Sequence, residues 1–155
     1  MESNLHRVET EKWLNEKFKF HNAIFLNLRY SDYLQTSAPL TKLEIVNINK
    51  RYLRNLERHQ NIKGGKNRLK RLVVIEGKEG GRRHAHMIIE IPKDKTYQEF
   101  SFDCFTSANM TKGIRSDFKD KPFIEKVFEQ GGLVNYLTKE SNNNTDNIDI
   151  KNSRY

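Results

Sequence analysis

The sequence contains few of the residues that mark secreted or membrane proteins. Only one of its 155 residues is a cysteine, Cys104, so no disulfide can form within the chain. No uninterrupted apolar run approaches the roughly 20 residues that a membrane-spanning helix needs. The first residues also lack the apolar core of a secretory signal. These absences exclude a disulfide-stapled scaffold and a bilayer span, and they predict a cytoplasmic protein.

The overall composition is that of a polar globular chain with one core. Hydrophobic residues make up 35% of the chain and charged residues 31%, and the length suits a single domain, expected over residues 1–140. Residues 141–155 are rich in Asn, Asp and Ser and have little to bury. They are predicted to form a disordered end or a linker.

Positive charge is concentrated in the middle of the chain. The formal net charge is +8, and residues 40–83 contain thirteen Lys and Arg residues against four acidic ones. Such a patch attracts a polyanion and gains affinity by releasing condensed counterions, although it can also be a solvated surface. The residues predicted to contact DNA are Lys50, Arg51, Arg54, Arg58, Lys78, Arg82 and Arg83.

Hydrophobic periodicity predicts a mixed α+β fold. Thr41 and Glu44 form a T-x-x-E capping box before a helix that carries apolar residues at steps of three and four. Two further helices are expected over residues 9–18 and 97–109, and a short one over 133–140. Strands are expected over residues 20–30, 69–76, 84–92 and 122–129, with the middle two forming a hairpin. This order predicts an antiparallel sheet with helices mainly on one face.

The second strand of the hairpin separates apolar from polar side chains. Ala85, Met87 and Ile89 alternate with His84 and His86, so the apolar residues must pack on the helices while the histidines point to the opposite, open face. If Glu76 on the first strand pairs with His84, its carboxylate lies on that same face, with Cβ atoms about 5 Å apart.

Glu76, His84 and His86 are therefore predicted to hold one divalent ion. A carboxylate and two imidazoles with open positions suit Mg²⁺ or Mn²⁺, with water and phosphate completing the shell, and would also accept Zn²⁺. The alternative is that both histidines are polar residues on a solvated sheet face.

Tyr136 is the candidate nucleophile. In Tyr136-Leu137-Thr138-Lys139, the tyrosine and the lysine share one helical face. A tyrosine hydroxyl can form a covalent intermediate that conserves the phosphodiester bond energy, and Lys139 can offset charge that develops on the phosphate. The alternative is that Tyr136 packs with Leu133 and Leu137 while Lys139 is merely exposed.

Taken together, these motifs resemble a known family. Residues 23–28 (AIFLNL), His84-Ala85-His86 and Tyr136-Leu137-Thr138-Lys139 look like the three ordered motifs of single-tyrosine rolling-circle replication initiators of the HUH endonuclease superfamily. Glu76 matches the position where several members place a carboxylate metal ligand. In one departure, Asn27 stands where the first motif usually carries a small hydroxylated residue.

The resemblance implies an RRM-like (ferredoxin-like) core, a divalent metal cofactor and a single-stranded or hairpin DNA substrate from a plasmid or virus. It implies that Tyr136 takes the 5′-phosphate, frees a 3′-OH for synthesis and later rejoins a strand. Action at the nucleoid or a replication site, beside a helicase or host replication proteins, follows from the same family.

Two other kinds of function remain open. Mobilisation relaxases and single-strand transposases perform the same chemistry on different DNA. A non-catalytic single-strand binding protein would instead hold the backbone with basic residues and stack bases on Phe25, Tyr30 or Tyr33.

Overall fold

A computed structural model describes residues 2–31, 39–62, 68–77, 82–115, 123–127 and 147–155. It contains the helices α1 (Glu2–Lys17), α2 (Lys42–His59) and α3 (Tyr97–Met110) and the strands β1 (Ala23–Arg29), β2 (Arg71–Glu76), β3 (His84–Glu90) and β4 (Ile124–Lys126). The helix predicted over residues 133–140 lies outside the described residues.

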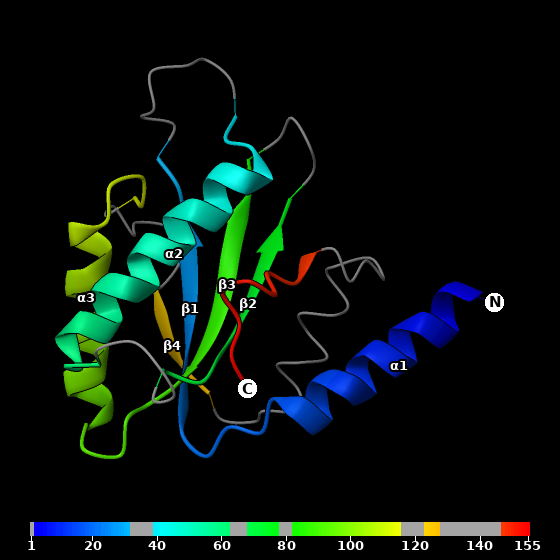
Figure 1. Ribbon diagram of the computed structural model, residues 1–155, viewed down its shortest axis with the longest axis horizontal. Coiled ribbons are helices and arrows are strands. Elements are labelled where there is room, and N and C mark those ends of the chain that lie inside the picture. The colour runs from blue at the N-terminus through cyan, green and yellow to red at the C-terminus, as the bar shows by residue number, and fades with distance from the viewer. Residues whose placement is uncertain (1, 32–38, 63–67, 78–81, 116–122, 128–146) are drawn as a thin grey trace.

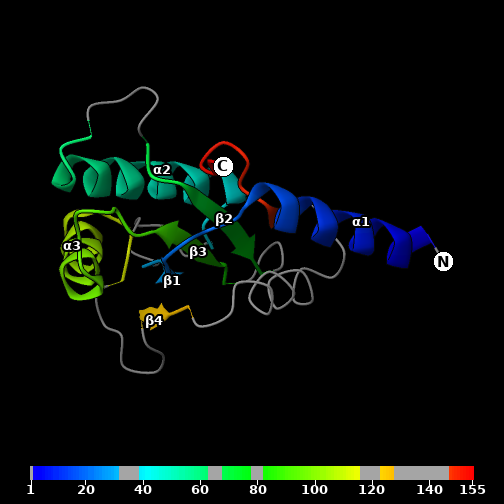
Figure 2. The same ribbon diagram turned by 90° about the horizontal axis from the view of Figure 1, so that it is seen from below.

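The four strands form one antiparallel sheet in the order β2-β3-β1-β4. After α1 the elements follow as strand, helix, strand, strand, helix, strand, and α2 and α3 cover one face of the sheet (Figures 1 and 2). This arrangement confirms the predicted α+β class and is consistent with a ferredoxin-like fold. The first and last strands are shorter than the sequence pattern suggested.

Local signals explain where α2 and α3 begin. The hydroxyl of Thr41 accepts the backbone N–H of Glu44, whose carboxylate in turn accepts the N–H of Thr41. Thr96 and Glu99 repeat this capping box at α3. Hydrogen bonds from the cap backbone lower the pKa of both glutamates below the ordinary value.

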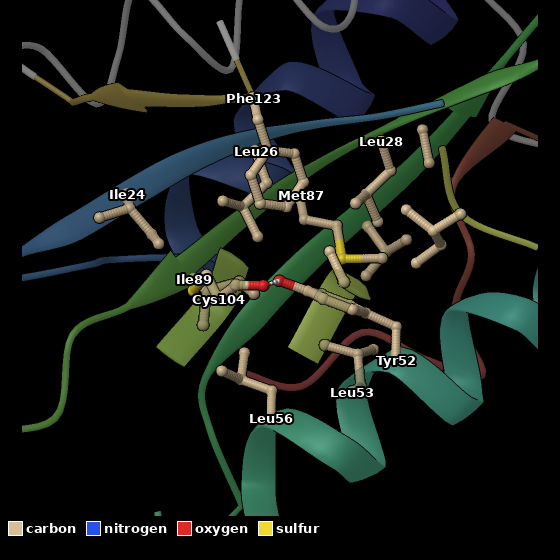
Figure 3. Packing of buried hydrophobic residues seen from close by; sticks show 14 of the residues in the cluster. Ile24, Leu26, Leu28, Tyr52, Leu53, Leu56, Met87, Ile89, Cys104 and Phe123 are labelled. Atoms are coloured by element: carbon tan, nitrogen blue, oxygen red, sulfur yellow. Dashed lines mark hydrogen bonds between the residues drawn. The ribbon is translucent and has the colours of Figure 1, made fainter. Parts of the chain in front are cut away.

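The main core lies between the sheet and these two helices. It contains the predicted apolar residues of β3 (Ala85, Met87 and Ile89), alternate residues of β1, and Tyr52 of α2. The Tyr52 hydroxyl donates to the backbone carbonyl of Cys104 at 3.2 Å (Figure 3). The single cysteine is thus buried, and burial raises the pKa of its thiol.

The sequence pattern predicted that the opposite face of the sheet is open, and this prediction is wrong because apolar residues cover part of that face. Leu14 of α1 and Phe18, which follows this helix, pack there with Phe25 and Ile88 in a second and smaller cluster of buried residues. The helix α1 begins at Glu2 rather than near residue 9 and has almost no amphipathic periodicity along its length. Its last turns provide the apolar contacts that cover one end of this face.

Residues 147–155, expected to be part of a disordered tail, are packed against the domain. The backbones of Arg154 and Arg71 exchange two hydrogen bonds of 2.8 Å, and Asp149 N donates to Val73 O at 2.9 Å. Asn152 Nδ2 also donates to Val46 O of α2. The physical reason is that β2 is an edge strand whose outer N–H and C=O groups need partners, which this segment supplies.

Among the described residues, no helix is both long enough and apolar enough to cross a membrane.

Candidate metal centre

Sheet register brings Glu76, His84 and His86 together. Glu76 is paired directly with His84 across the β2–β3 hairpin, and His86 follows two residues later on β3, so all three side chains leave the same face. The predicted cross-strand pair is confirmed. The site lies on the face away from α2 and α3, next to the cluster that α1 covers.

One carboxylate oxygen stands between the two imidazoles. Glu76 Oε2 lies 3.0 Å from His84 Nε2 and 3.2 Å from His86 Nε2, and the three potential ligand atoms lie within 4.8 Å of one another. Ligands bound to one ion at about 2.1 Å and at right angles are separated by about 3 Å. The two distances from Glu76 Oε2 match this separation, and the trio could hold a divalent ion.

Asn27 fixes the orientation of the His86 ring. Its side-chain oxygen Oδ1 lies 2.8 Å from His86 Nδ1, and Asn27 is the direct partner of His86 in the β1–β3 pairing. Because a carboxamide oxygen only accepts, this contact is a hydrogen bond in the tautomer whose Nδ1–H donates to Asn27 Oδ1. The ring nitrogen Nε2 is then the one that faces Glu76 and is available as a ligand.

The Phe25 ring supports the same imidazole from one side. Its plane is tilted 15° from that of His86, with ring centroids 5.2 Å apart. Phe25 is one pleat along β1 from Asn27, so both contacts come from the strand of the first motif. The sequence alone left the role of Asn27 undecided. Pairing β1 with β3 in the register that sets Asn27 opposite His86 would have identified this role.

The three side chains differ in their access to solvent. The exposed fraction is 7% for the side chain of Glu76, 8% for His86 and 42% for His84. A carboxylate held in a dry position needs a nearby positive charge, which a metal ion or a protonated imidazole supplies. Only His84 lies on the accessible side, so an ion would be approached from there.

Arg29 is a further residue of this face that the sequence analysis did not select. It is paired with His84 across β1 and β3, so its side chain leaves the sheet beside the accessible histidine. A guanidinium at this place suits a phosphate that approaches an ion bound by His84. Its position at the end of β1 could be predicted only once the strand register was known.

The predicted nucleophile and its lysine cannot be placed. Tyr136 and Lys139 lie outside the described residues, as does Lys78. Two of the other tyrosines are unsuited to the role, since Tyr30 and Tyr52 are buried and burial raises the pKa of each hydroxyl. Tyr30 is also engaged with the side chain of Asn49.

Comparison of the chain with models of protein families, with curated proteins and with solved structures gives no match.

The basic residues predicted to contact DNA do not form one surface with the metal centre. Four of them are exposed on the outer side of α2, which packs on the opposite face of the sheet: Lys50, Arg51, Arg54 and Arg58. Arg82 and Arg83 precede β3 and flank the centre in sequence. Arg83 Nη1 donates to the backbone oxygen of Leu40 at 3.1 Å, and Leu40 lies shortly before α2 in the chain. Arg71, counted with the basic stretch, is buried and paired with Glu57.

Proposed function

We propose that this protein is a metal-dependent endonuclease of the HUH type that nicks and rejoins single-stranded DNA. The observation that carries the proposal is the position of Glu76 Oε2, within 3.2 Å of an imidazole nitrogen of both His84 and His86. The fold supports it, because the sheet register sets the strand of the first motif beside the two histidines. The ion would be Mg²⁺ or Mn²⁺.

The chemistry is a phosphodiester transesterification. A bound divalent ion would polarise a non-bridging phosphate oxygen. The hydroxyl of Tyr136 loses its proton and attacks the phosphorus, the bond to the 3′ oxygen breaks, and that oxygen takes up a proton to leave a free 3′-OH. The 5′-phosphate stays on Tyr136, while Lys139 and Arg29 offset the charge on the phosphate. Attack by a 3′-OH on the phosphotyrosine reverses these steps and joins a strand.

Within this proposal the substrate is a short single strand or an origin hairpin, and the biological role is the initiation of rolling-circle replication of a plasmid or virus. Arg82 and Arg83, together with Lys78, would hold phosphates near the centre. The cations on α2 would contact DNA only where it passes around to the other face of the sheet. A helicase or host replication proteins would act on the freed 3′ end at the replication site.

The test is cleavage of a fluorescently labelled random single-stranded library by the full chain in Mn²⁺, followed by a denaturing gel. The proposal predicts nicked products and a protein band shifted by covalent DNA. His84→Ala and Tyr136→Phe should each abolish both, whereas His21→Ala, an exposed histidine away from the centre, should retain them. Cleavage that persists in His84→Ala at the wild-type rate would overturn the proposal.

Relaxases and single-strand transposases use the same chemistry, and the products separate a transposase from a replication initiator. A replication initiator would release a joined circle from a substrate with two origins, whereas a transposase would insert one strand into another. The non-catalytic alternative is weakened by burial, because Phe25 stacks on His86 and Tyr30 lies in the main core. Neither ring is available to stack on a base, and Tyr33 lies outside the described residues.

A further inference from the structure

A second site lies on the helix-covered side of the sheet. A cavity of about 320 Å³ is bounded by α2, by the start of β2 and the residues that lead into it, and by the C-terminal segment 147–155. Figure 2 shows this last segment (red) lying against α2. The cavity exists because Asn152 of that segment bonds to the backbone of α2 while the neighbouring residues pair with the edge of β2.

Among the described residues, six cationic side chains and one carboxylate line the cavity. The carboxylate is that of Glu57. The cations come from three separate parts of the chain and are Lys50, Arg54, Arg68, Arg71, Lys151 and Arg154. Two of them belong to the segment that the sequence predicted to be disordered. The cluster is therefore a product of the fold rather than of one charged run.

The carboxylate of Glu57 is already paired with one of these cations. Arg71 Nη1 bonds to Glu57 Oε1 at 2.5 Å and Arg71 Nε donates to Asn152 O at 2.7 Å. Both side chains are almost fully buried, at 4% and 9% exposure. Burial lowers the pKa of Arg71, the hydrogen bond and charge of Glu57 oppose this shift, and repulsion from Arg154 and Arg68 adds to it. Positive charge thus remains in excess around this space.

Four other cations of the lining have no carboxylate partner among the described residues. Among the described residues, Lys50, Arg54, Arg68 and Lys151 form no ion pair with a carboxylate, and all four are exposed. Like charges gathered around one concave space repel one another unless an anion enters. Arginine forks match the oxygens of a phosphate in bidentate contacts, and lysine adds a point charge.

We propose that this cavity binds a phosphate group of a multiply charged ligand, at a site separate from Glu76, His84 and His86. The phosphate could belong to a free polyphosphate or nucleotide, or to a nucleic-acid strand, because both present the same oxygens. The proposal does not depend on the metal centre.

The test is calorimetric titration of the full chain with inorganic pyrophosphate in the presence of a metal chelator, so that no metal ion can bridge the two. We expect one site, and at least tenfold weaker binding in Arg54→Gln and in Arg68→Gln. Both residues are exposed, so the substitutions should leave thermal unfolding unchanged. Arg58→Gln is the matched control, since it removes an exposed arginine of the same helix that does not line the cavity.

Equal affinity in the two cavity variants and in Arg58→Gln would overturn the proposal, as would the absence of pyrophosphate binding to the wild type. Competition then identifies the source of the phosphate. Displacement of pyrophosphate by a 12-nucleotide oligothymidine, added at the same total concentration of phosphate groups, would assign the site to nucleic acid. Persistent binding of pyrophosphate in the presence of that strand would assign it to a free phosphate ligand.

Discussion

The two faces of the four-stranded sheet carry different kinds of side chain. Toward α2 and α3 every strand presents apolar residues, and the buried charge of Arg71 is matched by Glu57. On the other face a small apolar cluster under α1 gives way to Asn27, Glu76 and two histidines. Stability comes mostly from the first face, because apolar area removed from water is the larger favourable contribution. The second face is free to hold polar groups that a stable core would exclude.

The largest loss of stability should come from breaking the ion pair between Arg71 and Glu57 on the helix-covered side. Glu57→Gln leaves the Arg71 guanidinium buried without a counter-charge, and we expect it to lower the free energy of unfolding by about 3 to 5 kcal/mol. Urea denaturation followed by circular dichroism measures the change. Asp103→Asn is the matched control, because its partner Lys95 is 28% exposed, and it should cost less than about 1 kcal/mol. A loss below 1 kcal/mol in Glu57→Gln would contradict this account.

The next largest loss of stability should come from creating a cavity in the core on the same face. Leu26→Ala removes a fully buried side chain of β1 and should destabilise the protein by about 3 kcal/mol. Leu43→Ala on α2, where the leucine is 63% exposed, should change stability by less than about 0.5 kcal/mol. The two variants differ only in where the leucine lies, so equal midpoints in urea would refute the assignment of the core to this face.

The helix-covered face could be predicted from sequence because its signals are local. The alternation of Ala85, Met87 and Ile89 with the two histidines identified both faces of β3, and the capping box located the start of α2. Each signal depends on neighbours within a few residues, which is where periodicity and capping act.

The structure of the other face could not be predicted from the sequence, because it depends on contacts between distant parts of the chain. Nothing in α1 indicated that Leu14 and Phe18 would cover β1 and β3, since that helix lacks an amphipathic stripe. On the helix-covered side, the position of the C-terminal segment was missed for the same reason, because the segment pairs through its backbone with the edge of β2 and a polar sequence gives no sign of that. The contact of Asn27 with His86 likewise required the register of β1 against β3.

A smaller effect is expected from Asn27, which acts through His86 as a positioning residue. Asn27→Leu removes the acceptor for His86 Nδ1 and should weaken Mn²⁺ binding by about 10- to 100-fold. Asn27→Asp keeps an acceptor at the same place and should restore most of the affinity. A purely structural role predicts that both variants bind Mn²⁺ like the wild type once folded, which calorimetry on each variant would reveal.

The smallest effect on stability should come from His84, the exposed member of the trio. In the absence of metal, His84→Ala should shift the free energy of unfolding by less than about 0.5 kcal/mol. His86→Ala should cost more, about 1 to 3 kcal/mol, because it empties the space against Phe25 and leaves Asn27 without its donor. Urea unfolding in a chelator compares the two, and equal losses would show that His84 is part of the core.

The most direct test of the central claim is titration of the metal-free full chain with Mn²⁺ by isothermal calorimetry. If Glu76, His84 and His86 hold one ion, the wild type and His21→Ala should bind one equivalent with the same affinity. His84→Ala, folded as judged by circular dichroism, should show at least a tenfold loss. One equivalent bound by His84→Ala with wild-type affinity would contradict the account, and so would the absence of any Mn²⁺ binding by the wild type.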